Sequence, residues 1–387
     1  MKRYFLSLAS IFLGLMPVSA NELPTFTLPD VVIYASSDVD TVVNAQQVNI
    51  GGAKTVPELL RTTAGIQIQA RPNAGGNEDL SVKLRGHDSR HYTVLVDGVP
   101  HSMSGVMGGG YVNWNAIPLG MVERIEITKG SKSAAHGQTE GGIINIITKK
   151  SANAGELQFT AGSNDRRQYN FNYGLQNAKL SLNMYANKAE QDAYLRNSDY
   201  DNEQAGFNLS YELNNTDTLR VKYDHQQLKR GLVVQNVPGF ADFDSRYPAT
   251  PIGDSFANYQ GKLPGDGSYT KIFRNNFNVS WNSNRTNGSD SITYWKNYEK
   301  QREHNVIGGQ VIFDRYNVTD KSDGLMYKGS TKLNPKHYLG YGIDYKRLRY
   351  GYGWYNVGAD QAGALYPSQK MNLLGVYVED SWKIDNR

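Results

Sequence analysis

The sequence contains no cysteine in 387 residues, which excludes disulfide bonds, thiolate metal sites and cysteine nucleophiles. Beyond the first twenty residues it has no apolar run long enough to cross a membrane as a helix. It also has little excess of either charge, with 41 Lys and Arg against 37 Asp and Glu. A nearly neutral chain lacks the basic surface that nucleic acid requires, so we predict no nucleic-acid partner.

Tyrosine and glycine are abundant instead. The chain has 26 Tyr against 12 Phe, together with 39 Gly, a composition that favours short strands, tight turns and amphipathic aromatic surfaces. Its length leaves room for more than one domain.

Residues 1–20 have the pattern of a secretory signal peptide. Lys2 and Arg3 precede an apolar run at 4–16, and Val18-Ser19-Ala20 places small residues before a cleavage point. Residue 21 is not a cysteine, so a lipid anchor at the new terminus is not available. An exported chain of this kind is periplasmic, secreted or an outer-membrane barrel.

The next 130 residues predict an extended arm and a small domain. Residues 21–50 carry Pro24 and Pro29 with no partner strand nearby, which indicates a flexible arm. Residues 54–66 predict a short helix that ends at Gly65. Dense apolar runs then alternate with glycine-rich turns, so residues 51–150 predict an α+β domain with its own core.

The pattern changes after residue 150. About ten runs alternate apolar or aromatic residues with polar ones; Leu180, Leu182, Met184 and Ala186, for example, share one face. A soluble sandwich also alternates. Here, however, the polar face is rich in amide and charged side chains, and short connections alternate with long ones at 231–270 and 351–370. Residues 151–387 therefore predict antiparallel transmembrane β-barrel strands.

Six blocks in the N-terminal region carry a family resemblance. They read LPDVVIYAS (28–36), TVPELLRTTAGIQIQ (55–69), LSVKLRG (80–86), TVLVDGVP (93–100), IPLGMVERIEITKGSKSAAHG (117–137) and GGIINIITK (141–149). In this order they resemble the plug domain of TonB-dependent outer-membrane receptors. The run VYVEDSWKI near the C-terminus looks like a barrel strand of the same family.

The resemblance implies a function and partners. Such receptors bind a scarce, large ligand, most often a ferric siderophore, and import it into the periplasm when TonB, an inner-membrane protein, moves the plug. The implied location is the outer membrane of a Gram-negative bacterium, in contact with lipid and lipopolysaccharide, with an extracellular metal chelate as ligand. Cobalamin or haem uptake is the alternative within the family.

A segment matching the TonB box would pair with TonB as an added strand. It consists of Pro29, Asp30, Val31, Val32, Ile33, Tyr34 and Ala35. A second candidate, DTVVNA at residues 40–45, lies closer to the helix, and we prefer the first.

Charged plug residues match family positions that form ion pairs with the barrel wall, namely Arg85, Glu123, Arg124 and Glu126. Charge pairs in a wet lumen separate at modest cost, which suits a plug that must move.

The loops at 86–91 and 101–114 match those that touch ligand in the resembling receptors. Side chains suited to an anionic or aromatic chelate are Arg85, His87, Arg90, His101, Tyr111 and Trp114. His87, His91, His101 and His136 with Met103 and Met107 could also indicate a metal or haem, but scattered His and Met seldom ligate. We therefore predict no resident metal or cofactor; the iron chelate is cargo.

The barrel region departs from the family. Residues 151–387 hold about ten strands, whereas plugged transporters close with about 22. We therefore expect this chain to be the N-terminal part of a longer receptor. An enzyme is disfavoured because no Walker spacing and no G-x-S-x-G elbow occurs. A passive porin or adhesin barrel remains the competing function; it would need neither plug nor TonB box.

Overall fold

The computed structural model describes residues 39–45, 55–70, 80–101, 112–131, 134–136, 140–149, 153–250, 264–353 and 365–384. Among these residues, no helix is both long enough and apolar enough to cross a membrane. The described chain has two parts, the N-terminal domain at 39–149 and the large sheet that follows it.

A five-stranded mixed sheet forms the centre of the N-terminal domain. Its strand order is β1-β6-β7-β4-β5, and β4 and β7 are its one parallel pair. Their bounds are β1 Thr41–Asn44, β4 Tyr92–Val96, β5 Val99–Pro100, β6 Val122–Lys129 and β7 Gly142–Thr148. Strand β1 lies within the predicted flexible arm, so that prediction was wrong for residues 41–44, which hydrogen-bond to β6. These residues are part of the second TonB-box candidate at 40–45, which is therefore paired with β6 in this structure.

The remaining elements of this domain pack beside the sheet. Helix α3 spans Val56–Leu59, and β2 (Ile66–Ala70) pairs with β3 (Leu80–Leu84). The described residues of this domain also form three 3₁₀ turns, η2 (Trp114–Ala116), η3 (Leu119–Met121) and η4 (Ala134–His136). The helix is shorter than predicted, because the hydrogen bonds after it run from Leu60 N to Pro57 O and from Thr63 N to Leu60 O, a tighter 3₁₀ pattern.

The core of the domain consists of apolar side chains from the helical turn and from the strands of the sheet. Leu59 and Leu60 from the helical turn are fully buried, as are Ile125 and Ile127 from β6. One side chain of the large sheet, Tyr185, belongs to the same apolar cluster. The domain is thus packed against the large sheet as well as against itself.

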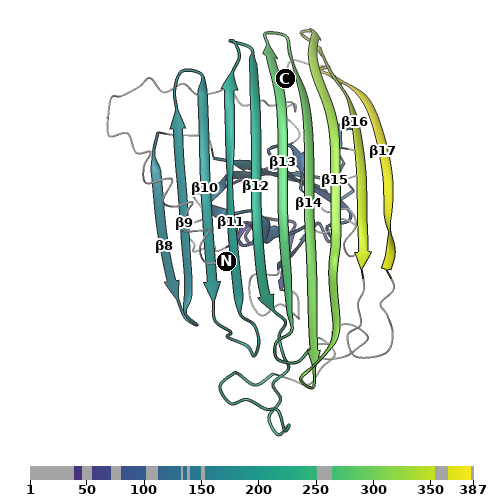
Figure 1. The fold of residues 1–387 in the computed structure, drawn as a ribbon. Coiled ribbons are helices and arrows are strands. Elements are labelled where there is room, and N and C mark those ends of the chain that lie inside the picture. The colour runs from purple at the N-terminus through teal and green to yellow at the C-terminus, as the bar shows by residue number, and fades with distance from the viewer. Residues whose placement is uncertain are drawn as a thin grey trace. The chain divides into compact units, whose positions relative to one another are not determined.

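The large sheet has ten antiparallel strands, each paired with its neighbours in the sequence, as Figure 1 shows. This confirms the predicted strand number and class. The bounds are β8 Gly155–Gly162, β9 Arg166–Gln176, β10 Leu180–Gln191, β11 Tyr200–Glu212, β12 Asp217–Gly231, β13 Tyr269–Arg285, β14 Gly288–Ile307, β15 Gln310–Asn334, β16 His337–Gly353 and β17 Leu365–Trp382. Among the described strands, β8 and β17 each have a single partner, so the sheet is not closed.

The two faces of this sheet differ in chemistry. One row of mutually paired residues crosses nine strands and is apolar or aromatic throughout: Leu175, Leu182, Leu209, Val221, Val279, Tyr294, Leu325, Tyr345 and Leu374. The adjacent row on the opposite face is mainly polar or glycine: Gly174, Asn183, Asn208, Lys222, Asn278, Trp295, Gly324, Lys346 and Leu373. Lys222 and Asn208 contact the N-terminal domain, so the polar face is the inner face.

The connections at one end of the sheet are all short. They lie at 177–179, 213–216, 286–287 and 335–336, and we call this the short-turn end. The opposite end carries the long connection 232–268, as predicted, but also a two-residue turn at Gly308 and Gly309, both with positive φ. A positive φ at both central residues suits the twist of a tight hairpin.

Candidate functional site

A tight turn brings one carboxylate of the N-terminal domain to the inner wall. Asp97 and Gly98 connect β4 to β5 with φ values of 50° and 80°. Aspartate followed by glycine is the favoured pair for such a two-residue turn. Gly98 N donates to Asn145 Oδ1 of β7 at 3.1 Å, which fixes the turn against the sheet.

Asp97 forms an ion pair with the wall. Lys222 Nζ of β12 lies 2.9 Å from Asp97 Oδ2, and the lysine side chain is 5% exposed. Thr148 donates to the same carboxylate through its backbone N–H and its hydroxyl, each at 2.9 Å. Burial acts to raise the pKa of Asp97, but the Lys222 charge and the Thr148 hydrogen bonds outweigh it and lower that pKa. The carboxyl is therefore charged at neutral pH.

A second contact surrounds His101. Arg274 of β13 donates to the His101 carbonyl oxygen at 2.7 Å and pairs with Glu299 of β14 at 3.5 Å. Both Arg274 and Glu299 side chains are 1% exposed. Burial and the Arg274 charge hold the pKa of His101 well below its usual range, so the ring is neutral.

Neutral amides complete the contact with the wall. Gln226 of β12 donates to Asn115 O at 2.8 Å and accepts a hydrogen bond from Asn113 at 3.0 Å. Asn297 of β14 donates to Pro100 O at 3.1 Å. If the domain moves away from the wall, water can take the place of each lost partner. The net free-energy cost is small because one hydrogen bond replaces another.

The predicted plug-to-wall ion pairs have a different local arrangement. Arg124 pairs with Glu123 at 2.8 Å and with Glu126 at 2.9 Å, all three on β6. Arg85 sits in a tight turn with φ 53°, and its guanidinium lies toward Gly130. Pairing of these four residues with the wall stays a prediction.

The predicted ligand contacts are not gathered in one place. Trp114 is 6% exposed within the apolar core, and His101 is 6% exposed at the wall. The cavity beside Trp114 measures ≈ 40 Å³, which is room for about one water molecule and too small for a metal chelate. Tyr111 and the predicted TonB box at 29–35 lie outside the described residues.

His87 and Arg90 lie on the loop between β3 and β4. The turn η4, in the connection between β6 and β7, donates from Ala134 N to Glu379 of β17 at 3.2 Å. Glu379 pairs with Gly340, near the start of β16. Contact of this loop with a ligand stays a prediction.

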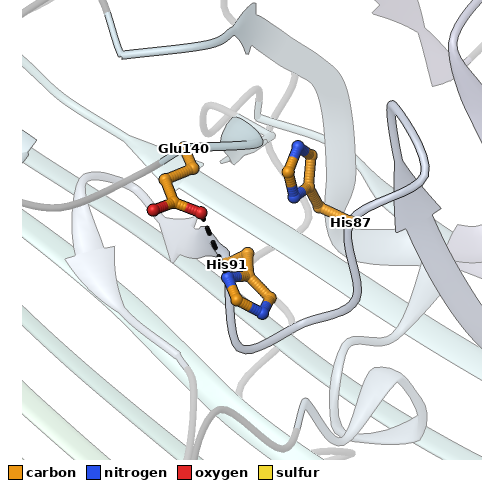
Figure 2. Close-up of side chains that lie close together, drawn as sticks. All are labelled: His87, His91 and Glu140. Atoms are coloured by element: carbon orange, nitrogen blue, oxygen red, sulfur yellow. Dashed lines mark ion pairs between the residues drawn. The ribbon is translucent and has the colours of Figure 1, made fainter.

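One group of side chains has the composition of a metal site. His87, His91 and Glu140 place one potential ligand atom each within 4.8 Å of one another (Figure 2). The cluster joins the β3–β4 loop to the connection between β6 and β7.

Lys222 and Arg274 of the wall were not predicted from the sequence. Each occupies a polar position in an alternating run, where many other charged residues also occur. Only the pairing partner distinguishes them, and the partners lie 125 and 173 residues away.

Comparison with known proteins identifies relatives of both parts. Residues 34–143 match the family described as the TonB-dependent receptor plug domain. A stretch of 124 residues is 39% identical to the vitamin B12 transporter BtuB of Vibrio cholerae serotype O1, covering 32% of this chain and 18% of that protein. The match therefore spans less than a fifth of the length of the curated relative.

Solved structures resemble the whole described fold. The pyoverdine outer-membrane receptor FpvA of Pseudomonas aeruginosa PAO1, bound to pyoverdine, gives a TM-score of 0.68 at 17% identity. That likeness covers 89% of this chain and 54% of the receptor. The unliganded ferric citrate transporter FecA gives a TM-score of 0.69 at 15% identity, covering 89% and 54%. At these identities the likeness establishes the fold.

Proposed function

Because this chain is a TonB-dependent receptor sequence, with a plug domain followed by antiparallel barrel strands, we propose that it imports a scarce, large ligand across the outer membrane. TonB is the proposed energy-coupling partner, and residues 29–35 are the segment it would bind. The long connection 232–268 would then face outward and the short turns the periplasm.

The polar contact between plug and wall carries this proposal. A passive pore needs no domain inside it, whereas this chain packs a folded domain against the inner face of the sheet. Apart from the Asp97–Lys222 ion pair and the contact of Tyr185 with the apolar core, the contacts named above are hydrogen bonds, so polar contacts predominate in that described set. Such a contact holds the plug in place yet allows displacement at modest cost.

We propose a ferric siderophore as the ligand. The support is the fold shared with the pyoverdine receptor FpvA and the ferric citrate transporter FecA, which are similar to this chain in structure. Cobalamin is the second candidate, favoured by the 39% identity to a vitamin B12 transporter over 124 residues.

An uptake experiment tests the transport proposal. Cells expressing the receptor from its own gene are compared with cells in which residues 29–35 are deleted. We expect the deletion to abolish energy-dependent uptake of the ligand while surface binding persists, because the TonB segment is not part of the ligand site. Unchanged uptake would favour a passive pore.

Ligand identity is tested on the same cells. A panel of radiolabelled ferric siderophores and labelled cobalamin is supplied separately, with a receptor-null strain as the control. Uptake of cobalamin alone would overturn the siderophore assignment and leave TonB-dependent import intact.

A further inference from the structure

Three side chains on the plug converge on a point that the transport proposal does not use. His91 Nδ1 lies 3.3 Å from Glu140 Oε2. The His87 and His91 rings have centroids 5.7 Å apart and are tilted by 49°, so they do not stack face to face. Figure 2 shows His87 beside the other two side chains. From this geometry we propose that His87, His91 and Glu140 bind a divalent transition-metal ion such as Zn²⁺.

The donor set fits that class of ion. Two imidazoles and one carboxylate are a common ligand set for zinc, with bond lengths of about 2.0–2.2 Å. Ligand atoms around a tetrahedral ion are then about 3.3–3.6 Å apart. The His91–Glu140 pair already has this spacing, and the full set lies within 4.8 Å, so modest side-chain rotation closes it.

The backbone holds both histidines in place. His87 N donates to Leu84 O and Leu84 N to His87 O, each at 3.0 Å, across the turn formed by Arg85 and Gly86. His91 N donates to Asp88 O at 3.0 Å in the next turn. The backbone at both histidines is therefore ordered without the ion, which lowers the entropic cost of binding.

Gly141 brings Glu140 to the histidines. Its backbone N donates to His91 O at 2.9 Å. A Cβ added at Gly141 would lie 3.1 Å from His87 Cβ and 3.3 Å from His91 O, a crowded position. The absence of a side chain here allows the connection between β6 and β7 to approach the β3–β4 loop.

The charges around the cluster also suit a cation. Arg90, the nearest cation along the loop, is engaged by Asp88, its Nη2 lying 2.7 Å from Asp88 Oδ2. In this ion pair the two charges offset each other. The His91 and Glu140 side chains are 50% and 72% exposed, which leaves room for water at the remaining coordination positions. The site would link two plug loops, and it does not depend on what the receptor transports.

Metal binding by the full chain tests the proposal. Tag-free protein in detergent is stripped with a chelator and dialysed against Zn²⁺, and bound zinc is measured by elemental analysis. We expect one zinc per chain with micromolar affinity. Loss of an outer-shell partner alone weakens metal sites by about 10- to 100-fold, so His87→Ala, His91→Ala and Glu140→Gln should each weaken binding by at least about tenfold.

His337→Ala is the matched control, because His337 pairs with Asp380 at 2.7 Å on the large sheet and belongs to no described three-donor cluster. It should bind zinc as the unaltered chain does. Co²⁺ gives a second readout, a visible absorption band that should disappear in His91→Ala. Heat-dependent mobility in gel electrophoresis reports whether each variant is folded. Zinc binding below one equivalent, or equal binding by folded His91→Ala, would overturn the site.

Discussion

At the scale of single residues, the contact between plug and wall depends on a few buried charges. Lys222 is the clearest case, since its ammonium is buried and its ion-pair partner belongs to another domain. Removing one member of a buried pair leaves the other charge without compensation, whereas removing both does not.

Replacing Lys222 with methionine should therefore loosen the plug. Asp97 is 25% exposed, so we expect a loss somewhat below the value for fully buried pairs, about 2–3 kcal/mol. The measurement is the urea concentration at which a protease cleaves residues 39–149. The double variant Lys222→Met with Asp97→Asn should recover part of the loss; a double variant as unstable as the single one would contradict this account.

His101 should make stability depend on pH. Its pKa is lowered in the folded protein, whereas an unfolded histidine titrates near about 6.5. The unfolded chain thus binds more protons below that pH. The contribution of the neutral His101 ring to the free energy of unfolding is fully present above about pH 6.5. It falls by about 1.4 kcal/mol per pH unit as the pH decreases, until the pKa of His101 in the folded protein is reached.

Unfolding free energies measured in urea between about pH 7.5 and 5 would show this slope. His101→Gln should flatten it, and equal slopes in the two proteins would refute the role of His101. Asp97 also makes the folded protein less stable as the pH falls, but at lower pH. Because its pKa is lowered in the folded protein, its contribution is lost only below about pH 3.9, the pKa of an aspartate in an unfolded chain.

At the scale of elements, glycine positions decide how β6 and β7 meet. Gly142 has φ 122°, and a Cβ there would collide with the Thr128 carbonyl oxygen of β6. Gly120 has neither a positive φ nor any atom within 4 Å of an added Cβ.

Gly142→Ala should therefore destabilise the plug by at least about 2 kcal/mol, since both the backbone conformation and the strand contact would have to change. Gly120→Ala should change stability by less than about 0.5 kcal/mol. Urea unfolding of both variants provides the comparison. Equal effects would show that the β6–β7 contact tolerates a side chain at this position.

Local sequence patterns predicted some features of these elements correctly and others wrongly. Alternation predicted the shared face of Leu180, Leu182, Met184 and Ala186, and the residues paired with them on β11 are likewise apolar. The short β1 was missed because its partner β6 lies about 80 residues away and the local sequence gives no sign of it. Helix α3 was predicted too long because the chain continues in tighter turns with similar residues.

At the scale of the whole molecule, the apolar row along the outer face should face lipid. A lysine at the middle of that face costs about 2–4 kcal/mol in a membrane, whereas one on the inner face meets water or the plug. Val279 and Ser280 are neighbours on β13 with opposite orientations.

Val279→Lys should reduce insertion into lipid vesicles strongly, and Ser280→Lys should reduce it less. Density-gradient flotation after refolding measures the inserted fraction, with the unaltered chain as reference. Equal insertion of the two variants would contradict the assignment of the outer face.

The sequence alone determined the strand pattern, the change of character near residue 150 and the resemblance to a receptor plug. These features depend on the period of a strand and on turn chemistry, which act between neighbouring residues. Only the tertiary structure decided that Asp97 meets Lys222, that Trp114 is buried, and that His87, His91 and Glu140 converge. Those contacts depend on how distant segments pack against one another, and no local pattern encodes which polar residue among many will find a partner.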